Sequence, residues 1–540
     1  MVQKIFFGLM LVLFGGLAIL GVPEKGAELL PPVVAFAAIF ILRKAVFALL
    51  LGGLVGAFLL SAADPQGAVR VYLETGIFGA LSGSWHVGAI LFTLILGAFA
   101  AVLEASGGLD SLIKRFLKTG KDGGRKRFQI TAGGFGFVCF FDGLANSLLV
   151  GRVLAPAADR AGVSRVKLAY IADSTGSALA CIVFISTWIA AQLSYINEAM
   201  QAVGLEGGPS GYSLFFSSIP YNFYCLFTLI LVFVVAGSGW NPGPMGRFEA
   251  EAERLGKERM QPGGASEERS GAAVWRAVVP LLVLSLSIPI CFYLWEPKDI
   301  FPVTVDKLRD SFGGAAGPYA LTAGAIMALG AALICYPREK GRRSAFEAME
   351  RGAAAFLHPL LILVLAWAFG NMLKHLGTAS LMAEVLSGGV GYASFPLVIF
   401  LVSAVTSFVT GSSWGTMGLM MPLAIPILFG LGGMEGSEVA ALEYLPATIA
   451  AVFGGAVFGD HCSPFSDTTI VSSIACGVEP GDHVKTQMPY ALFAASVAIL
   501  PGYLGISLGL PVGVILISGL IILVVLPIYL SRRSKSAVEG

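Results

Sequence analysis

The chain has 540 residues, of which 56% are hydrophobic and only 13% are charged, and its formal net charge is +1. Soluble domains carry roughly 25% charged residues, so a soluble protein of this length would lack the charges for its surface. The nearly neutral balance gives no indication of nucleic-acid binding. The composition therefore predicts an all-α polytopic membrane protein.

Twelve apolar segments predict about 12 transmembrane helices, since a helix needs about 20 residues to cross a bilayer. The first resembles a signal peptide, but no A-x-A cleavage site follows it, so residues 1–28 are predicted to hold a retained N-terminal transmembrane helix. The predicted spans are 5–22, 29–42, 45–62, 87–105, 168–195, 219–239, 277–295, 317–336, 353–373, 446–475, 488–507 and 511–531.

Lysine and arginine gather in alternate loops, which is the pattern that orients membrane helices with their basic loops in the cytoplasm. The loop at Arg43 and Lys44, the charged loop over 241–276 and the tail after residue 531 all carry Lys or Arg, whereas no Lys or Arg occurs between Lys374 and Lys485. We therefore expect a multi-pass protein of the cytoplasmic (inner) membrane with both termini in the cytoplasm.

Segment 128–158 is apolar, but basic clusters flank it on both sides and it is too short for two crossings. This pattern predicts a re-entrant hairpin that enters from the cytoplasm and turns near Asp142–Ser147. Segment 394–430 is interrupted by Thr410–Thr416 and has no flanking Lys or Arg, so it predicts a second hairpin from the outside. Irregular backbone at this depth is tolerated where it is buried in protein or lines a wet cavity.

The two halves of the chain share an order of elements, namely three spans, a hairpin with a polar tip, and a long span with a polar interruption. Because the first half starts outside and the second starts inside, they predict an inverted-topology repeat. The predicted units after residue 28 are the first repeat at 29–240, a charged cytoplasmic loop at 241–276, the second repeat at 277–510, and a C-terminal helix with a basic tail at 511–540.

The two interrupted spans are 168–195, with its predicted break at Asp173–Gly176, and 446–475, with its predicted break at Gly459–Thr469. Broken helices in matching positions of two halves are the best sequence indication of a transport site. The carbonyl end of a half-helix carries partial negative charge, which suits a bound cation.

Four acids lie inside apolar segments, where ionisable residues are costly and are usually functional. They are Asp142, Asp173, Asp460 and Asp467, and we expect them to meet at one site near the middle of the membrane. Burial favours the protonated form of a carboxylate, so such a group can exchange a proton for a cation. We expect Na⁺ at Asp173, Asp460 and Asp467, because small hard cations take oxygen ligands.

Other polar residues near the breaks and tips complete the predicted site. His461 is expected either to relay protons or simply to hydrogen-bond a neighbour, and Asp460 and Asp467 have the alternative of capping a half-helix. The candidate ion or substrate ligands are Asp142, Asn146, Asp173, Ser174, Thr175, Ser412, Ser413, Thr416, Asp460, His461, Ser463, Asp467, Thr468 and Thr469.

An enzyme is not expected. Gly411–Gly415 fits the G-x-S-x-G pattern, but that motif makes a nucleophile elbow only after a strand of a soluble α/β sheet. Here it follows an apolar helix. The seven cysteines form no C-x-x-C pair, and no cofactor is expected beyond Na⁺ and H⁺ as transported or coupling ions.

The stretch Gly459–Ser473, continued by Gln487–Tyr490, closely resembles the hallmark of the NhaC-type Na⁺/H⁺ antiporter family. Asp142–Gly151 and Arg165–Thr175 look like the matching N-terminal motifs of that family, and the resemblance extends over about 85–510. It implies the fold of the ion transporter superfamily, with two hairpins and two discontinuous helices, and it implies sodium coupling.

The predicted function is Na⁺/H⁺ antiport by alternating access, with H⁺ and Na⁺ competing for the intramembrane aspartates. The alternative is a sodium-coupled transporter of an amino acid or a small organic anion, as in malate/lactate exchange, with Trp188 and Trp414 as walls for such a substrate. A channel is a third class. The expected partners are the lipid bilayer, Na⁺ and H⁺ without nucleic acid, and a homodimer is left open.

Overall fold

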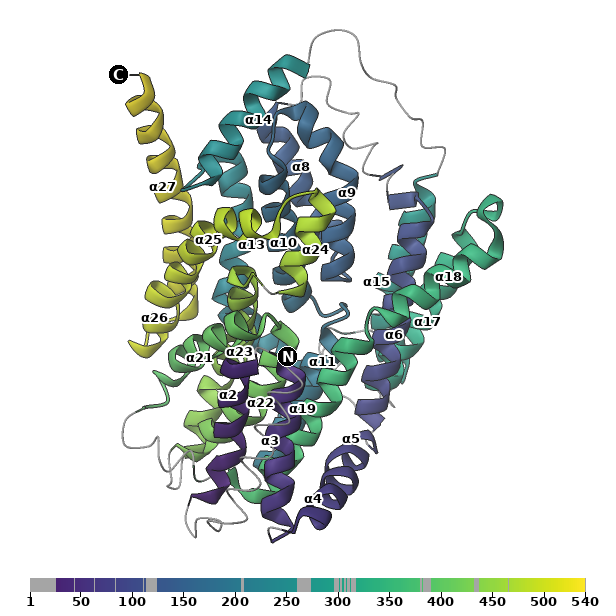
Figure 1. The fold of residues 1–540 in the computed structure, drawn as a ribbon, viewed down its shortest axis with the longest axis vertical. Coiled ribbons are helices and arrows are strands. Elements are labelled where there is room, and N and C mark those ends of the chain that lie inside the picture. The colour runs from purple at the N-terminus through teal and green to yellow at the C-terminus, as the bar shows by residue number, and fades with distance from the viewer. Residues whose placement is uncertain are drawn as a thin grey trace.

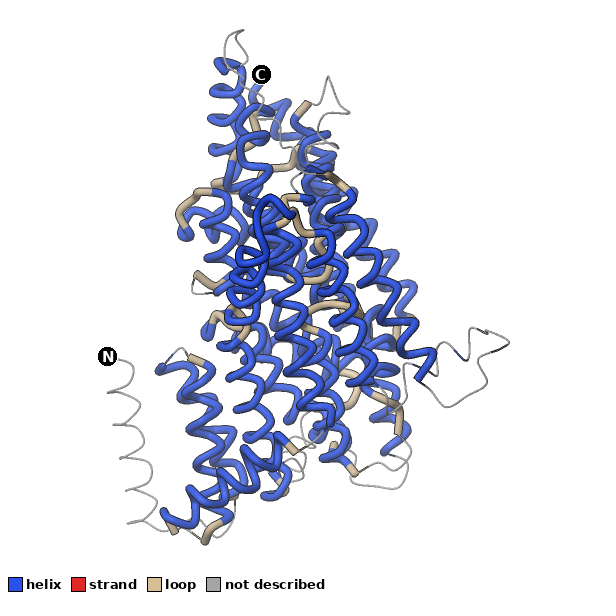
Figure 2. The backbone as a smooth tube through the Cα atoms, turned by 90° about the vertical axis from the view of Figure 1, so that its right-hand side faces the viewer, coloured by secondary structure: helices blue, strands red, loops and turns tan. Residues whose placement is uncertain are grey.

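The computed structural model describes most of the chain between residues 26 and 539, and Figure 2 shows these residues as helices and connecting loops without a strand. The expected all-helical architecture is confirmed for this part of the chain. The predicted first span, 5–22, lies outside the described residues. The gaps within the described part are 43, 63, 83, 110, 113–123, 205–207, 260–272, 296–300, 302–303, 305–306, 308–310, 312–316, 379–380, 382–389, 432–436 and 465.

Helices follow one another along the whole described chain (Figure 1). Those of the first half are η1 (Ala27–Leu29), α2 (Leu30–Leu42), α3 (Ala45–Leu60), α4 (Pro65–Val71), η2 (Tyr72–Phe78), α5 (Gly79–Leu81), α6 (Ser84–Ala105), α8 (Arg125–Val138), α9 (Gly143–Ala161), α10 (Arg165–Ile182), α11 (Ile189–Val203), α12 (Gly211–Ser218), η3 (Ile219–Tyr221), α13 (Phe223–Ser238) and α14 (Met245–Arg259). Those of the second half are α15 (Trp275–Trp295), α17 (Gly317–Cys335), η4 (Arg338–Lys340), α18 (Gly341–Ala354), α19 (Leu357–Leu376), α21 (Phe395–Thr410), α22 (Ser413–Gly430), α23 (Ser437–Cys462), α24 (Asp467–Cys476), α25 (Pro480–Val497), η5 (Ala498–Tyr503), α26 (Leu504–Ser507) and α27 (Val512–Glu539).

Eight helices among the described residues are long and apolar enough to cross a membrane, or ten if two bent helix pairs each count as one span. About twelve were expected. Part of the difference lies in the undescribed N-terminus, and part lies in α2, whose 13 residues are short for a crossing. The composition and these helices make the chain a multi-pass membrane protein.

Two antiparallel helix pairs occupy the predicted hairpin segments. In the first, α8 and α9 are joined by a turn at residues 139–142, slightly earlier than the expected turn at Asp142–Ser147. In the second, α21 and α22 are joined at Gly411, whose φ of 62° is left-handed and suits glycine. The Ser412 side chain then caps α22 by accepting a hydrogen bond from the Gly415 N–H.

The first interrupted span breaks later than expected. Residues Asp173–Gly176 lie inside the regular helix α10, and the interruption falls at 183–188 between α10 and α11. The predicted position was wrong because hydroxyl side chains can bond to their own helix. The Thr175 hydroxyl donates to the Ile171 carbonyl at 2.7 Å and leaves the helix unbroken.

The second interruption lies between α23 and α24, at residues 463–466, within the predicted range Gly459–Thr469. Close packing holds α23 against α21 at this point. A Cβ atom at Gly459 would lie 2.3 Å from the Ala404 carbonyl oxygen, and one at Gly455 would lie 2.6 Å from that of Phe400. Small residues allow such close backbone approach between helices, so these glycines position the interrupted end of α23.

The predicted charged loop over 241–276 contains the helix α14, which returns to the ends of α8 and α10. Arg125 forms ion pairs with Glu249 and Glu253 of α14. The Glu249 carboxylate also accepts hydrogen bonds from the Ser164 N–H and hydroxyl at 2.8 and 2.7 Å. The helix α14 is therefore packed over the starts of α8 and α10.

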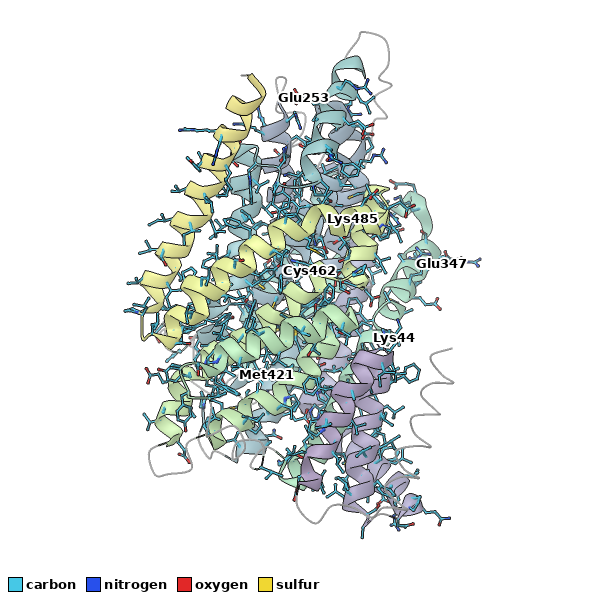
Figure 3. All side chains as sticks on the ribbon, turned by 60° about the vertical axis from the view of Figure 1, so that its left-hand side comes forward. Lys44, Glu253, Glu347, Met421, Cys462 and Lys485 are labelled. Carbon is cyan, nitrogen blue, oxygen red and sulfur yellow. The ribbon has the colours of Figure 1, made fainter. Side chains whose placement is uncertain are left out.

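The interruption between α23 and α24 lies near the middle of the molecule's long axis. In Figure 3, Cys462 at the end of α23 lies near the middle of the long axis, whereas Glu253 of α14 lies close to one end. Lys44 lies nearer the middle than Glu253 does, although its charge predicted the same side. Its neighbour Ala45 packs on the second hairpin, since a Cβ at Gly415 would lie 2.3 Å from the Ala45 Cβ.

Candidate ion site

Helix α10 carries the acid at the centre of the site. The helix begins after Ser164, whose side chain accepts a hydrogen bond from the Lys167 N–H. Asp173 lies two turns further on and is completely buried. Its Oδ1 atom has no hydrogen-bond partner among the described residues. A buried carboxylate with one unpaired oxygen is an oxygen ligand that a proton or a cation can reach from within the protein.

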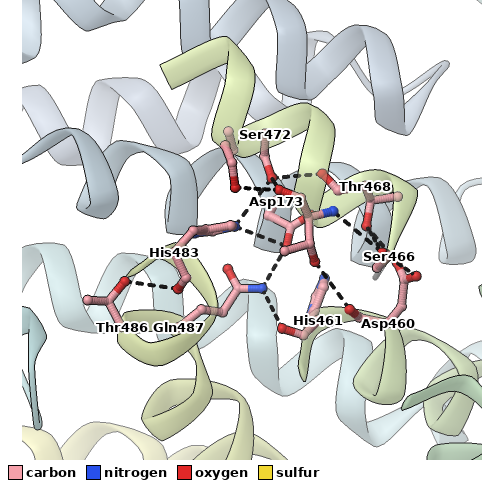
Figure 4. A network of polar contacts seen from close by, with 12 residues as sticks. Asp173, Asp460, His461, Ser466, Thr468, Ser472, His483, Thr486 and Gln487 are labelled. Carbon is pink, nitrogen blue, oxygen red and sulfur yellow. Dashed lines mark hydrogen bonds and ion pairs between the residues drawn. The ribbon is translucent and has the colours of Figure 1, made fainter. Parts of the chain in front are cut away.

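The other oxygen of Asp173 faces α25 (Figure 4). The Gln487 Nε2 atom donates to the Asp173 Oδ2 atom at 2.6 Å, and the His483 Nε2 atom lies 3.5 Å from the same oxygen. His483 and Gln487 are four residues apart and therefore share one face of α25. A helix from the second half of the chain thus holds the acid of the first half.

Two histidines border this acid. The His461 Nδ1 atom lies 2.9 Å from the Tyr224 hydroxyl, and its Nε2 atom has no hydrogen-bond partner in the described structure. The His483 Nε2 atom lies 3.3 Å from the Ser472 hydroxyl, and its Nδ1 atom is likewise buried without a partner. Gln487 joins the two sides, because it also donates to the His461 carbonyl at 3.0 Å.

Asp460 lies in the last turn of α23 and is held by residues just across the interruption. The Ser466 hydroxyl donates to its Oδ1 atom and the Thr468 hydroxyl to its Oδ2 atom, both at 2.6 Å. The Thr469 hydroxyl donates to the Asp460 carbonyl at 3.2 Å. Ser466 also caps the start of α24. The carboxylate therefore organises the break while both of its oxygens are occupied.

Asp142, at the tip of the first hairpin, is tied to the interruption between α10 and α11. The Thr187 hydroxyl donates to the Asp142 Oδ2 atom at 2.8 Å, and the Thr187 N–H donates to the Phe141 carbonyl at 2.9 Å. The Asn146 Nδ2 atom donates to the Gly136 carbonyl across the hairpin at 2.8 Å. These contacts fix the tip against the break.

The second hairpin tip makes a different set of contacts. The Ser407 hydroxyl of α21 donates to the Ala456 carbonyl of α23 at 2.6 Å, and the Ser413 hydroxyl approaches the same carbonyl at 3.5 Å. Thr416 is fully buried, and its hydroxyl oxygen has no hydrogen-bond partner among the described residues. This tip is thus held by α23 and not by an acid.

Not every expected ligand joins the polar network. Asp467 is exposed at the first position of α24, unlike the buried Asp173 and Asp460. Ser174 is buried within α10, and Thr175 packs on the first hairpin, where a Cβ at Gly136 would lie 2.3 Å from its hydroxyl oxygen. Ser463 is buried in the interruption, and its N–H donates to the Asp460 carbonyl at 3.1 Å.

The sequence-based set missed His483, Ser472 and the role of Gln487. A signal for two of them was available, because the pattern H-x-x-x-Q over His483–Gln487 places two polar side chains on one face of an apolar helix. Their partner, Asp173, is more than 300 residues away in the chain, so the pairing itself could not be read from spacing.

The buried oxygens around Asp173 and Asp460 are of the kind that hard cations take as ligands. Within the described ranges, no three His, Cys, Asp or Glu side chains gather closely enough to hold a metal ion. Hydroxyl, amide and carbonyl oxygens around Asp173 and Asp460 supply the other ligands that a hard cation takes.

Helices that can cross a bilayer surround buried acids and histidines, and this combination defines a membrane transporter. The chain belongs to the Na⁺/H⁺ antiporter family, whose sequence model matches residues 179–506. The matched range includes Asp460, His483 and Gln487, whereas Asp173 precedes it. The family is one of transporters and not a class of enzymes.

Individual proteins agree with this assignment. An uncharacterized protein of Haemophilus influenzae is 29% identical over 486 residues, which cover 88% of this chain and 90% of that protein. An uncharacterized Na⁺/H⁺ antiporter of the same species is 30% identical over 169 residues, 29% of this chain and 32% of that protein. The Alcanivorax borkumensis YdaH transporter has a similar fold, with a TM-score of 0.56 at 16% identity over 83% of this chain and 90% of that one.

Proposed function

We propose that the chain exchanges Na⁺ for H⁺ by alternating access, with the two ions competing for the Asp173 carboxylate. The observation that carries the proposal is the unpartnered Asp173 Oδ1 atom, buried beside His461 and His483. A group that must be neutral or bind a cation when buried is suited to carry either ion but not both. Such competition couples the Na⁺ flux to the H⁺ flux without any other structural element.

Asp460 has a supporting role in this proposal. Its oxygens are occupied by the Ser466 and Thr468 hydroxyls, so it anchors the half-helices on each side of the break. The carbonyl end of α23 then presents partial negative charge toward a cation at Asp173. Thr469 and Gln487, which contact the carbonyls of Asp460 and His461, orient that end.

The pairs α8–α9 and α21–α22 serve in this proposal as re-entrant hairpins from opposite faces, within an inverted repeat. The basic loops set the orientation, with both termini in the cytoplasm and the protein in the cytoplasmic membrane. Alternating access then moves the hairpins and half-helices relative to the rest of the bundle, so that Asp173 faces one side at a time.

Purified protein in liposomes tests the proposal. An imposed Na⁺ gradient is expected to drive a pH change inside the vesicles, and the same gradient of choline is expected to drive none. Protein-free liposomes are the control for leak. No sodium-dependent pH change, together with sodium-dependent uptake of a labelled amino acid or carboxylic acid, would contradict the proposal and favour an organic substrate.

A further inference from the structure

Another buried acid, Glu198, lies on α11, apart from the network around Asp173. Glu198 is 8% exposed, and neither of its carboxylate oxygens has a hydrogen-bond partner among the described residues. An ionised carboxylate buried without a partner is costly. Neither hairpin nor interruption contains this residue, so the site described above does not explain it.

Glu198 lines a cavity of 110 Å³ between α11, α19 and α22. One water molecule needs roughly 10–15 Å³ of such space, so the cavity has room for several. The helix α19 makes room for the acid at Gly370, where a Cβ atom would lie 3.0 Å from the Glu198 Oε1 atom. On α22, Pro426 has no N–H, so the Pro422 carbonyl lacks its usual hydrogen bond within the helix. Both prolines line the cavity.

Two titratable groups lie near Glu198. Lys374 of α19 lines the same cavity and is exposed, so its positive charge opposes a metal cation there and also favours release of a proton from Glu198. Tyr195 is the titratable group that faces Glu198 from its own helix. The residues that α22 contributes to the described lining, Pro422 and Pro426, carry no charge.

Further unpartnered polar atoms continue from Glu198 along the contact between α11 and α22. The Tyr195 hydroxyl, one turn before Glu198, is buried without a partner and lies 3.0 Å from where a Cβ at Gly418 of α22 would be. The Thr416 hydroxyl, two residues before Gly418, is also buried without a partner. Buried polar groups usually have a hydrogen-bond partner in the protein or in ordered water, and these two lie on or beside the part of α22 between the cavity prolines and the tip at Gly411.

We propose that Glu198 exchanges protons with cavity water at the outer mouth of the path to the central site. Its carboxylate takes a proton from a hydronium ion to give the carboxylic acid and water, and the reverse step releases the proton. The inference rests on the Na⁺/H⁺ exchange proposed above. It also uses the orientation proposed there, because the ends of α11 and α19 that form the cavity lie on the external side.

A comparison of two exchange modes tests this role. Glu198→Gln preserves the shape of the side chain but cannot carry the proton, so Na⁺-driven proton movement is expected to fall by about tenfold. Exchange of labelled sodium for unlabelled sodium needs no proton, and it is expected to stay within about twofold of the wild-type rate. Glu443→Gln, an exposed position of α23, is the matched control. An equal loss of both modes, or no loss of either, overturns the proposal.

Chemical labelling tests whether Glu198 carries a proton, even if the wild-type protein shows no antiport. Dicyclohexylcarbodiimide adds to protonated carboxyl groups in apolar surroundings and forms a stable acylurea without a leaving group. Peptide mass mapping of the treated full-length protein is expected to find the adduct on Glu198 at acidic pH and progressively less of it as pH rises. Absence of the adduct at acidic pH overturns the proposal, whereas failure of sodium-driven proton movement alone overturns the proposed function.

Discussion

The two interrupted helices hold their acids in different ways. In α23–α24, Asp460 lies on the broken helix itself, and hydroxyls from just beyond the break fill both of its oxygens. In α10–α11, the acid at the break is Asp142 of the hairpin, which Thr187 holds. Asp173 lies ten residues before that break and keeps one oxygen unpaired. A carboxylate with both oxygens hydrogen-bonded is suited to fix a structure, and one with a free oxygen, as at Asp173, is suited to exchange ions.

The largest effect is expected from the half-paired acid. Asp173→Asn keeps an oxygen that can accept the Gln487 hydrogen bond but removes the charge, so neither ion can be carried. Na⁺-driven proton movement in liposomes should fall by about 100-fold or more, which corresponds to a loss of about 2.7 kcal/mol. Retention of more than a tenth of the wild-type rate would show that Asp173 is not the exchanging group.

A smaller effect is expected when Asp460 loses one of its two hydroxyl partners. Thr468→Val leaves the Asp460 Oδ2 atom buried without a donor, which costs about 1–3 kcal/mol. Thermal unfolding in detergent should therefore occur at a lower temperature, with a partial loss of transport. The matched control is Thr322→Val on α17, whose hydroxyl donates to its own helix at Pro318. Equal destabilisation by both changes would deny Asp460 an anchoring role.

The hydrogen bond from Thr187 to Asp142 is expected to matter less for stability than for coupling the tip of the first hairpin to the break between α10 and α11. Thr187→Val removes the hydroxyl that donates to Asp142, and Asp142 keeps other contacts of its own. Transport should fall by about three- to tenfold, equivalent to about 0.7–1.4 kcal/mol. A Thr187→Ser variant restores the donor and should recover most of the rate; no recovery would place the defect in packing instead.

The smallest effect is expected at Asp467, although its sequence context resembles that of Asp460. It is exposed at the start of α24, and surface substitutions usually change stability by less than about 0.5 kcal/mol. Asp467→Asn should therefore keep the transport rate within about twofold. A loss as large as that of Asp173→Asn, measured side by side, would mean that the start of α24 lines the ion path.

Much of the fold could be predicted because interruptions of apolar runs by small polar residues are visible locally. The helix pairs in segments 128–158 and 394–430 were predictable for this reason. The break near Asp460 coincides with a Ser-Pro sequence, which the interior of a regular helix does not favour. The first break was misplaced since a Thr in an apolar helix can satisfy itself, as Thr175 does.

The candidate site was less predictable because its contacts join distant parts of the chain. Asp173 was identified from its position in an apolar segment, but its partners His483 and Gln487 depend on how α10 packs on α25. Exposure was equally invisible in the sequence. Nothing local distinguishes Asp460 from Asp467, and their different environments follow from the direction in which each half-helix leaves the break.

Proton release on sodium binding tests the competition at Asp173 most directly. Na⁺ is added to the purified protein in weakly buffered detergent solution, and a pH indicator follows the release, with choline as the control cation. Competition at Asp173 predicts that the wild-type protein releases protons with Na⁺ and that Asp173→Asn releases none while it remains folded. Undiminished release from Asp173→Asn would contradict it and move the exchange to another group.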